Sequence, residues 1–319
     1  MNLRRILFAI CAALPLAAGA VYPDKPVRLV VPFPPGGGTD AAGRLIANAL
    51  SSELKQQVVV ENRAGAAGSI GAQAVVDSSP DGYTLFFATT GAMAINPHLY
   101  SNLRHIPLTD FTPIAMVASF PNVLVVNPAV PAKNVAEFIA LAKSKPGGLT
   151  YGSSGAGSSS HLSVALLEHM TGTKFTHVPY KGAAPATADF LGGRLDFMID
   201  NITTHSQLVK QGKSRALGVT GIVPSALLPG VPTIAAAGVP GYDVTIWYAI
   251  VGPAKMPADI VNRLYTDLRT VMATPKMKES LEALGTDPNI QPPAELARII
   301  RAESEKWAAV VKASGAKAE

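Results

Sequence analysis

Cysteine is almost absent from the 319 residues, and the one cysteine, Cys11, lies in an apolar N-terminal stretch. That stretch follows Arg4 and Arg5 and ends at Ala18-Gly19-Ala20, which is the pattern of a secretory signal peptide over residues 1–20. Ile10 stands before Cys11, where a lipoprotein signal requires a small residue. We therefore expect an exported, soluble chain that has neither disulfides nor thiolate metal sites.

Long apolar runs and clusters of positive charge are also missing after residue 20. Hydrophobic residues make up 48% of the sequence but occur in short runs, so a large core is expected without a membrane span. The formal net charge of +5 is small and the Lys and Arg residues are scattered, so nucleic acid is not an expected partner. The six histidines form no His-Glu-x-x-His pattern, and we expect no metal and no cofactor.

A glycine-rich loop follows the first strand-like run of the sequence. Residues 27–33 are mostly apolar, residues 34–40 read Pro-Pro-Gly-Gly-Gly-Thr-Asp, and residues 41–50 have helical spacing, with Thr39 or Asp40 as the predicted N-cap. The first N–H groups of a helix lack intrahelical partners and carry the positive end of the dipole, so such a loop favours a small anion. The loop matches neither of the common phosphate-binding fingerprints.

The same arrangement of strand, glycine loop and helix recurs at residues 149–169. There the loop reads Gly-Ser-Ser-Gly-Ala-Gly-Ser-Ser-Ser over residues 152–160. Strands alternate with helices around both loops, which predicts α/β architecture with mostly parallel sheets flanked by helices. Ligands of open α/β sheets bind at the carboxyl ends of strands, so the two loops are expected to face each other across a cleft.

The chain is predicted to cross twice between two lobes. A fourth strand begins at Phe111, breaks around residues 119–122 and resumes at Val123, which suggests two short strands at a domain crossover. Residues 244–251 form the predicted return crossing. We therefore assign residues 21–121 and 248–319 to lobe I and residues 122–247 to lobe II. The tail is predicted to be helical, with its apolar faces packed against lobe I.

Several segments resemble, in order, the Bug receptors, which are the extracytoplasmic solute-binding proteins of tripartite tricarboxylate transporters. In lobe I these segments are residues 33–40, 60–71, 80–85 and 94–100, and in lobe II they are residues 151–155, 178–182, 192–196 and 212–217. The match covers essentially the whole mature chain. The resemblance implies a type II-like periplasmic binding protein that closes on a small organic carboxylate or amino acid and delivers it to the membrane permease of the transporter.

The resemblance also implies where the ligand lies, in the two glycine loops, and it carries over no catalytic residue. Backbone amides, small hydroxyls and bridging waters are the expected contacts, since neither loop contains Lys or Arg. The strand-end aspartate of the family matches Asp200. The predicted ligand-binding residues are Phe33, Gly37, Gly38, Thr39, Thr90, Ser153, Gly155, Ser158, Ser159 and Asp200.

Three questions stay open at the level of the sequence. Each predicted hydroxyl can bind the ligand or instead cap a helix or turn. Asp200 can accept from a ligand ammonium or hydroxyl, or cap a neighbouring backbone group. A signalling receptor that docks on a sensor kinase would have the same sequence features as a transport receptor.

A serine hydrolase is a remote alternative. Ser154 lies in a near-match to the nucleophile elbow, and Asp200 and His205 follow in the hydrolase order of serine, acid and histidine. Asp200 and His205 are close in the sequence, which argues against their lying on separate strand-end loops.

Overall fold

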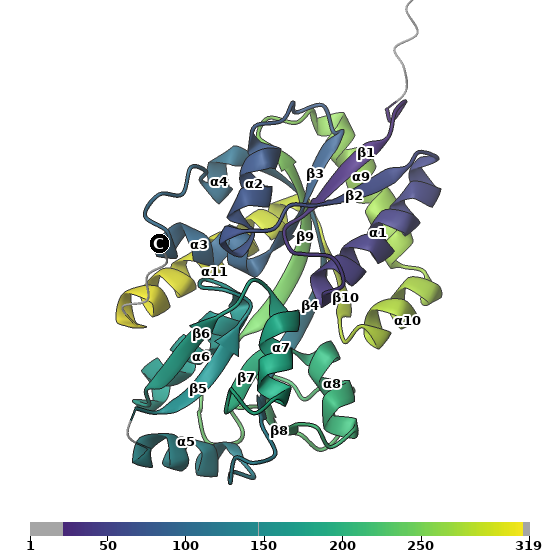
Figure 1. Cartoon of the computed structure of the whole chain (residues 1–319). Helices are drawn as coiled ribbons and strands as arrows, with labels where there is room; N and C mark the ends of the chain where they lie inside the picture. The colour runs from purple at the N-terminus through teal and green to yellow at the C-terminus, as the bar shows by residue number, and fades with distance from the viewer. Residues whose placement is uncertain (1–21, 146, 315–319) are drawn as a thin grey trace, which may run out of the picture.

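The computed structural model describes residues 22–145 and 147–314, so the predicted signal peptide lies outside the described residues. Two lobes of mixed α/β structure lie one above the other, joined by long strands in the middle of the molecule (Figure 1). None of the described helices combines the length and the apolar character needed to cross a membrane.

Lobe I, the upper lobe in Figure 1, is built from the start and the end of the chain. Its N-terminal elements are β1 (Val27–Val31), α1 (Gly38–Leu54), β2 (Val58–Asn62), the short 3-10 turn η1 (Ala66–Gly68), α2 (Ser69–Val76), β3 (Thr84–Thr89), the π-helical turn η2 (Gly91–Ile95), α3 (Asn96–Leu99) and α4 (Pro107–Asp110). Its C-terminal elements are α9 (Ala258–Met272), α10 (Pro275–Ala283), β10 (Asp287–Gln291) and α11 (Pro293–Ser314).

Lobe II is built from the middle of the chain. Its elements are α5 (Val135–Ser144), β5 (Leu149–Ser153), α6 (Ser159–Thr171), β6 (Phe175–Pro179), α7 (Ala183–Leu191), β7 (Phe197–Asn201), α8 (Ile202–Lys210) and β8 (Arg215–Val219). Two strands run between the lobes, β4 (Phe111–Val126) and β9 (Thr245–Pro253).

The strands pair in the order β2-β1-β3-β9-β4-β7-β5-β6, and β8 and β10 also pair with β4. Strand β1 is parallel to β2 and β3, and β5 is parallel to β6 and β7, as the alternation of strands and helices predicts. The pairs of β4 and β9 are antiparallel. The sheet is therefore mixed, because β9 runs antiparallel to β3 of lobe I and β4 runs antiparallel to β7 and β8 of lobe II.

Strand β4 corrects the predicted break around residues 119–122. Instead of two short strands, one strand of 16 residues runs through the region. It pairs with β9 up to Pro121, and from Asn122 onward it pairs with β7 and, one residue later, with β8. Pro121 therefore stands where the strand exchanges partners, a place where a missing N–H removes little from the ladder. The predicted residue limits of the lobes stay a prediction.

The tail differs from the prediction in two respects. Strand β10 was not expected, because its sequence Asp-Pro-Asn-Ile-Gln carries little strand signal, but it pairs with β4. Helix α11 packs on η2, α3 and β4 and also on α6 of lobe II, so it spans both lobes. Trp307, which lies on this helix, is fully buried.

The core follows the crossing strands from one lobe to the other. All six residues of β3 are buried, and so are all residues of β9 after Thr245. A continuous cluster of buried apolar side chains extends from β1 and α1 through β4 and β9 to Phe138 and Phe197 of lobe II. A second, smaller cluster lies in lobe II between β4, α7 and β7. The lobes therefore share one main core at the crossing.

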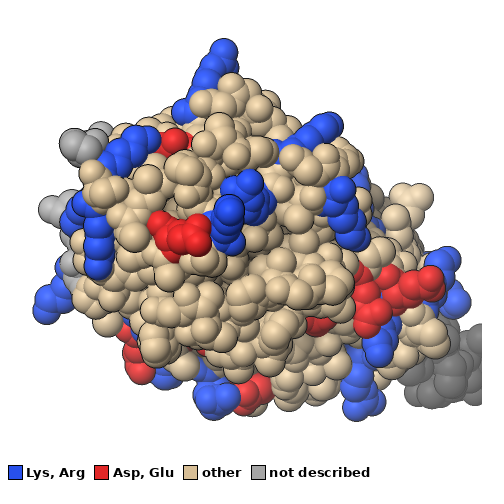
Figure 2. All heavy atoms as spheres, turned by 90° about the horizontal axis from the view of Figure 1, so that it is seen from below, with Lys and Arg blue, Asp and Glu red and all other residues tan. Residues whose placement is uncertain are grey.

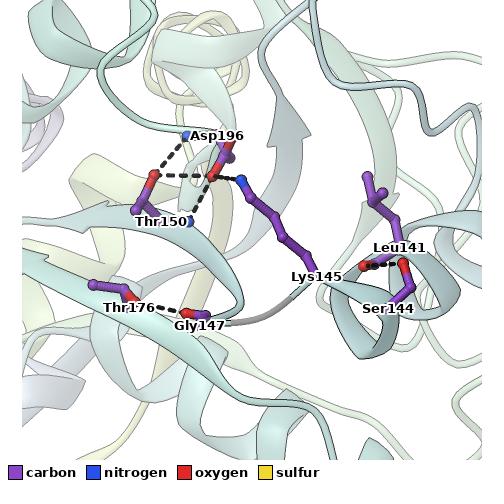
Figure 3. Close-up of polar contacts among 7 residues, drawn as sticks. All are labelled: Leu141, Ser144, Lys145, Gly147, Thr150, Thr176 and Asp196. Atoms are coloured by element: carbon purple, nitrogen blue, oxygen red, sulfur yellow. Dashed lines mark hydrogen bonds and ion pairs between the residues drawn. The ribbon is translucent and has the colours of Figure 1, made fainter.

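A polar cluster fixes the start of β5 in lobe II. Asp196 Oδ2 accepts hydrogen bonds from Thr150 N at 2.7 Å and Thr150 Oγ1 at 3.0 Å, and Lys145 Nζ donates to it at 3.1 Å (Figure 3). Burial raises the pKa of the Asp196 carboxyl, but the hydrogen bonds from Thr150 and Lys145 outweigh it and hold this pKa below its usual value. The carboxylate thus anchors the strand that leads into the second glycine loop.

Replacing this carboxylate by an amide is expected to destabilise lobe II. Asp196→Asn should lower the free energy of unfolding by about 1 to 2 kcal/mol at pH 7, because charge-assisted hydrogen bonds are lost. A depressed carboxyl pKa contributes stability above the unfolded value of about 4 and loses it as the pH falls through the folded value, so the difference should shrink at pH 3. Urea unfolding at both pH values measures it. Glu305→Gln, an exposed carboxylate on α11, is the control.

Candidate functional site

A cavity of about 450 Å³ lies between the lobes, and the N-terminal ends of α1, α6, α7 and α8 all reach it. Most of its lining is apolar, with Phe33, Phe120 and Ile246 among the larger side chains. Of the predicted ligand-binding residues, the structure brings together at this cavity Phe33, Gly37, Gly38, Thr39, Ser158, Ser159 and Asp200.

The first glycine loop presents the start of α1 to the cavity. The N-cap is Gly37 and not Thr39 or Asp40, and no side chain caps the first turn. Its φ of −86° suits any residue, whereas Gly36 has φ 88° and needs glycine. The first N–H groups of α1 therefore keep their donor capacity for a ligand.

Asp40 shapes this loop from within the helix. Its Oδ2 accepts from Gly36 N and from Arg44 Nε, both at 3.0 Å, and its Oδ1 accepts from Asn62 Nδ2 at 2.8 Å. Asn62 Nδ2 also donates to Phe33 O at 2.9 Å. Burial raises the pKa of Asp40, but the hydrogen bonds from Arg44, Gly36 and Asn62 outweigh burial and lower it. The carboxylate therefore stays charged and holds the loop in place, although Asp40 itself does not line the cavity.

The second glycine loop is held by its own serines. Ser158 is the N-cap of α6, and its Oγ donates to Gly155 O at 2.6 Å and accepts from His161 N at 3.4 Å. Gly155 has φ 128° and Gly157 has φ 81°, conformations that favour glycine. Ser158 therefore caps the helix and lines the cavity at the same time.

A stack of three rings supports the second glycine loop. Tyr151 stacks on His177 with centroids 4.8 Å apart, and His177 stacks on His161 at 4.2 Å. Ser153 Oγ and His177 Nε2 are 2.6 Å apart, and Gly157 N donates to His161 Nδ1 at 3.1 Å. Burial lowers the pKa of His177 to about 4 and that of His161 to about 3, so both rings are neutral at pH 7.

Helix α7 (Ala183–Leu191) contributes a third helix start to the cavity, a place that sequence reasoning did not assign to it. Its N-cap is Gly182 at φ 117°, no side chain caps it, and Gly182, Ala183 and Ala184 line the cavity. Lys181, just before it, is exposed and is the one lysine or arginine of the described residues that lines the cavity. The motif of residues 178–182 was recognised as a family segment, but nothing in it indicates a contact with the cleft.

Polar side chains gather on the side of the cavity formed by the crossing strands. Thr39 Oγ1 and Tyr248 Oη are 3.0 Å apart. Asp200 is buried, its Oδ1 accepts from Asn201 N at 2.8 Å, and its Oδ2 has no partner among the described residues. Burial raises the pKa of Asp200 to about 6, while the hydrogen bond from Asn201 lowers it. Buried Asn122, also at the cavity, keeps its Nδ2 without a partner among the described residues.

Three predicted ligand-binding residues do not line the cavity. Thr90 is fully buried and its Oγ1 accepts from Trp247 N at 2.9 Å, so it ties β9 to lobe I. Ser153 is fully buried and its hydroxyl is used by His177 and Gly155. Gly155 serves the turn that Ser158 closes. Their sequence neighbours Thr89, Gly91 and Ser154 do line the cavity. The predicted segments therefore reach the cavity, although Thr90, Ser153 and Gly155 themselves do not.

The serine, acid and histidine of the hydrolase alternative are not hydrogen-bonded to one another. His205 is fully buried, neither of its ring nitrogens has a partner among the described residues, and Ser154 Oγ lies 3.2 Å from Ser160 Oγ. Ser154, Asp200 and His205 therefore form no hydrogen-bonded triad. Within the described part of the chain, no three His, Cys, Asp or Glu side chains are grouped so that they could hold a metal ion.

The lobes approach each other closely around the cavity. A Cβ placed on Gly38 would lie 3.2 Å from Asn201 Nδ2, and one placed on Gly182 would lie 3.7 Å from Pro34 Cγ. Tyr100 Oη, at the end of α3, donates to Ala156 O in the second glycine loop at 2.9 Å. The structure is thus a closed arrangement in which a lobe I side chain holds a loop of lobe II.

A two-lobed α/β protein with a cavity at helix starts between its lobes belongs, by architecture, to the solute-binding proteins. Residues 42–316 match the model of the tripartite tricarboxylate transporter family receptor, TctC. The protein BugT of Bordetella pertussis is 35% identical over 325 residues, covering 99% of both chains. The chain belongs to this receptor family, as the resemblance of its motifs implied.

Solved structures agree with this assignment. The R. palustris protein Rpa4515 with adipate has a TM-score of 0.88 and 39% identity, covering 92% of this chain and 98% of that one. The periplasmic binding protein BugD has a TM-score of 0.86 and 33% identity, covering 93% and 100%. MatC of Rhodopseudomonas palustris with bound malate has a TM-score of 0.85 and 31% identity, covering 91% and 100%. The predicted two-lobed fold is confirmed.

The hydrogen bond from Tyr100 to Ala156 is expected to slow the release of a cleft ligand. Tyr100→Phe removes only the hydroxyl and leaves the carbonyl of Ala156 without that donor, so the closed form should lose about 1 kcal/mol and the ligand should dissociate about fivefold faster. Stopped-flow displacement measures the rate. The hydroxyl of Tyr265, on α9, has no hydrogen-bond partner among the described residues, so Tyr265→Phe should leave the rate unchanged. Equal rates in both variants would contradict a restraining role for Tyr100.

Proposed function

We propose that this receptor binds a small organic carboxylate with an apolar body in the cavity between its lobes and delivers it to the membrane permease of a tripartite tricarboxylate transporter. The observation that carries the proposal is that uncapped starts of α1 and α7 meet at a mostly apolar cavity. Free N–H groups at helix starts stabilise an anion, and the apolar walls favour a hydrocarbon body.

The charges at the cavity support an anion held mainly by neutral donors. Lys181 is exposed, so its attraction for a bound carboxylate is screened by solvent. Thr39, Ser158 and Ser159 add hydroxyl groups at the same helix starts. Adipate and malate, the ligands of two structural relatives, are both carboxylates. The residues proposed to contact the ligand are Phe33, Gly37, Gly38, Thr39, Ser158, Ser159 and Asp200, with Tyr248, Asn122 and the start of α7 added.

The proposal places the working protein in the periplasm. The family match and the similarity to the periplasmic binding protein BugD support this location, as does the predicted signal peptide over residues 1–20. Capture of membrane proteins with the ligand-loaded receptor tests the partner. A recovered permease subunit supports delivery to a transporter, and a recovered sensor kinase in its place would assign the receptor to signalling.

A matching carboxylate is expected to raise the melting temperature with one ligand per chain. At a hundredfold excess over the dissociation constant, binding to the folded state alone adds about 2.7 kcal/mol, which shifts the melting temperature by several degrees. Thermal denaturation with a panel of dicarboxylates, hydroxy acids, aromatic acids and amino acids measures it, with adipamide as the uncharged match to adipate. If no acid in a wide panel produced a shift, the carboxylate proposal would fail.

The pH dependence of binding is expected to identify the group that faces Asp200. With a pKa of about 6, Asp200 is mostly protonated below pH 6 and mostly charged above it. A ligand carboxylate near Asp200 is repelled by the charged form, so its affinity should fall as the pH rises from 5 to 8, with proton uptake on binding. An ammonium group near Asp200 would reverse both signs.

Titration calorimetry in buffers of different ionisation enthalpy measures affinity and proton uptake together. Asp200→Asn should keep the affinity of a carboxylate ligand and flatten its pH profile, because the amide carries no charge. Glu305→Gln, which removes an exposed carboxylate of α11 away from the cavity, is the matched control. A profile that is unchanged by Asp200→Asn would show that this side chain does not face the ligand.

A further inference from the structure

A second cavity, of about 490 Å³, lies on lobe I between α2 and the segment that follows α3. These elements lie beside each other in the upper lobe (Figure 1). The cavity belongs to lobe I alone, whereas the cleft is formed by both lobes. A volume of this size accommodates a small organic molecule.

Two residues at this second cavity keep buried polar atoms without partners. His105 is 2% exposed, and neither of its ring nitrogens has a hydrogen-bond partner among the described residues. Gln73 donates from Nε2 to Asp77 Oδ1 at 2.8 Å, but its buried Oε1 has no partner in the same part of the chain. Buried polar atoms are rarely left unpaired, so the wall of this cavity has hydrogen-bonding capacity that no described residue uses.

The charged residues at the second cavity are Arg63, Arg104 and Asp77. Arg104 is exposed and has no ion pair or hydrogen bond among the described residues, while Arg63 is engaged by Glu61. Apolar contact area comes from Ile70, whose exposed fraction of 54% is large for isoleucine, and from Leu103. A free guanidinium beside apolar surface suits a carboxylate that carries a hydrocarbon body.

We propose that the second cavity is a binding site for a small organic anion with an apolar body and a hydrogen-bond donor. Arg104 pairs with the anionic group, Ile70 and Leu103 contact the body, and Gln73 Oε1 accepts from the donor group. On the face shown in Figure 2, some Lys and Arg side chains adjoin Asp or Glu and others stand among uncharged residues, so an unpaired cation by itself does not define a site. The distinguishing feature here is the buried, unpartnered atoms of His105 and Gln73 at the same cavity.

The second cavity adjoins the cleft through the turn η1. Ala66 lines the second cavity and Ala67 lines the cleft, with φ values of 45° and 48°. Asn96 Nδ2 donates to Ala67 O at 3.1 Å and to Ser69 Oγ at 2.9 Å, which holds this shared wall. Because the two cavities share this wall and a carboxylate suits both, the experiment must report on each site separately.

Single cysteines provide such reporters, because Cys11 is the only cysteine of the sequence. In a Cys11→Ser background, Ala74→Cys places a thiol at the second cavity and Ala188→Cys places one at the cleft. Leu103→Cys is a second reporter for the lobe I site, and circular dichroism checks that each variant is folded. The probes are 3-hydroxybenzoate, which has a carboxylate, a ring and a hydroxyl donor, and its uncharged analogue 3-hydroxybenzamide. Mass spectrometry follows alkylation by iodoacetamide.

The expected result is that 3-hydroxybenzoate at about 10 mM slows alkylation of the Ala74→Cys thiol about tenfold, as a dissociation constant near 1 mM requires. Protection should weaken about tenfold with the benzamide or with Arg104→Gln, because a charged hydrogen bond is lost. Arg301→Gln, which removes an exposed arginine of α11, should leave protection intact. The proposal is overturned if neither lobe I reporter is protected, if only Ala188→Cys is protected, or if Arg104→Gln protects as well as the parent.

Discussion

The two strands that cross between the lobes are the constraint on which the cleft depends. Strands β4 and β9 pair with each other from Phe111–Pro253 to Pro121–Thr245 and are buried along most of their length. Thr220, fully buried, joins the two crossings, since its Oγ1 accepts from Asn122 N at 2.8 Å and donates to Val244 O at 2.7 Å. If the lobes move, the paired strands β4 and β9 must therefore bend near residues 120–122 and 244–246 without separating. The two glycine loops then stay aligned across the cleft.

The same crossing determines the electrostatics of the cleft. Tyr248 on β9 and Asp200 on β7 are brought to the cavity by the strands, and burial raises the pKa of both side chains. Among the described residues, Lys181 is the one cationic residue at the cavity, and it is exposed. No buried cation therefore lies beside Asp200 to lower its pKa. A cavity that excludes water without adding fixed cations thus raises the pKa of its buried acid.

The sequence predicts the elements near the glycine loops better than the residues at the cavity. Strand, loop and helix appear in order at both loops because periodicity and glycine content are local signals. The single strand β4, the pairing of β10 and the contact of α11 with lobe II depend on partners distant in the chain, which no local pattern encodes. For the same reason Tyr248 and Asn122 were missed, since within buried strands nothing distinguishes a residue at the cavity from a core residue.

The predicted hydroxyl residues divide into those that line the cavity and those that lie behind it, and the division has a physical cause. Ligand contact and structural support were treated as alternatives, but Ser158 caps α6 and lines the cavity, and Asp200 accepts from Asn201 N with one oxygen while the other has no partner among the described residues. Ser153 and Thr90 are each next in the sequence to a residue that lines the cavity, but they are buried behind it. Their hydroxyl oxygens are hydrogen-bonded to His177 and to the backbone of Trp247. A helix start that presents its N–H groups to a ligand needs a second layer of polar side chains to hold its loop, and short polar residues of the same kinds supply both layers. Composition alone therefore cannot separate the residues that face the ligand from those that position them, and only the depth of each side chain relative to the cavity does so.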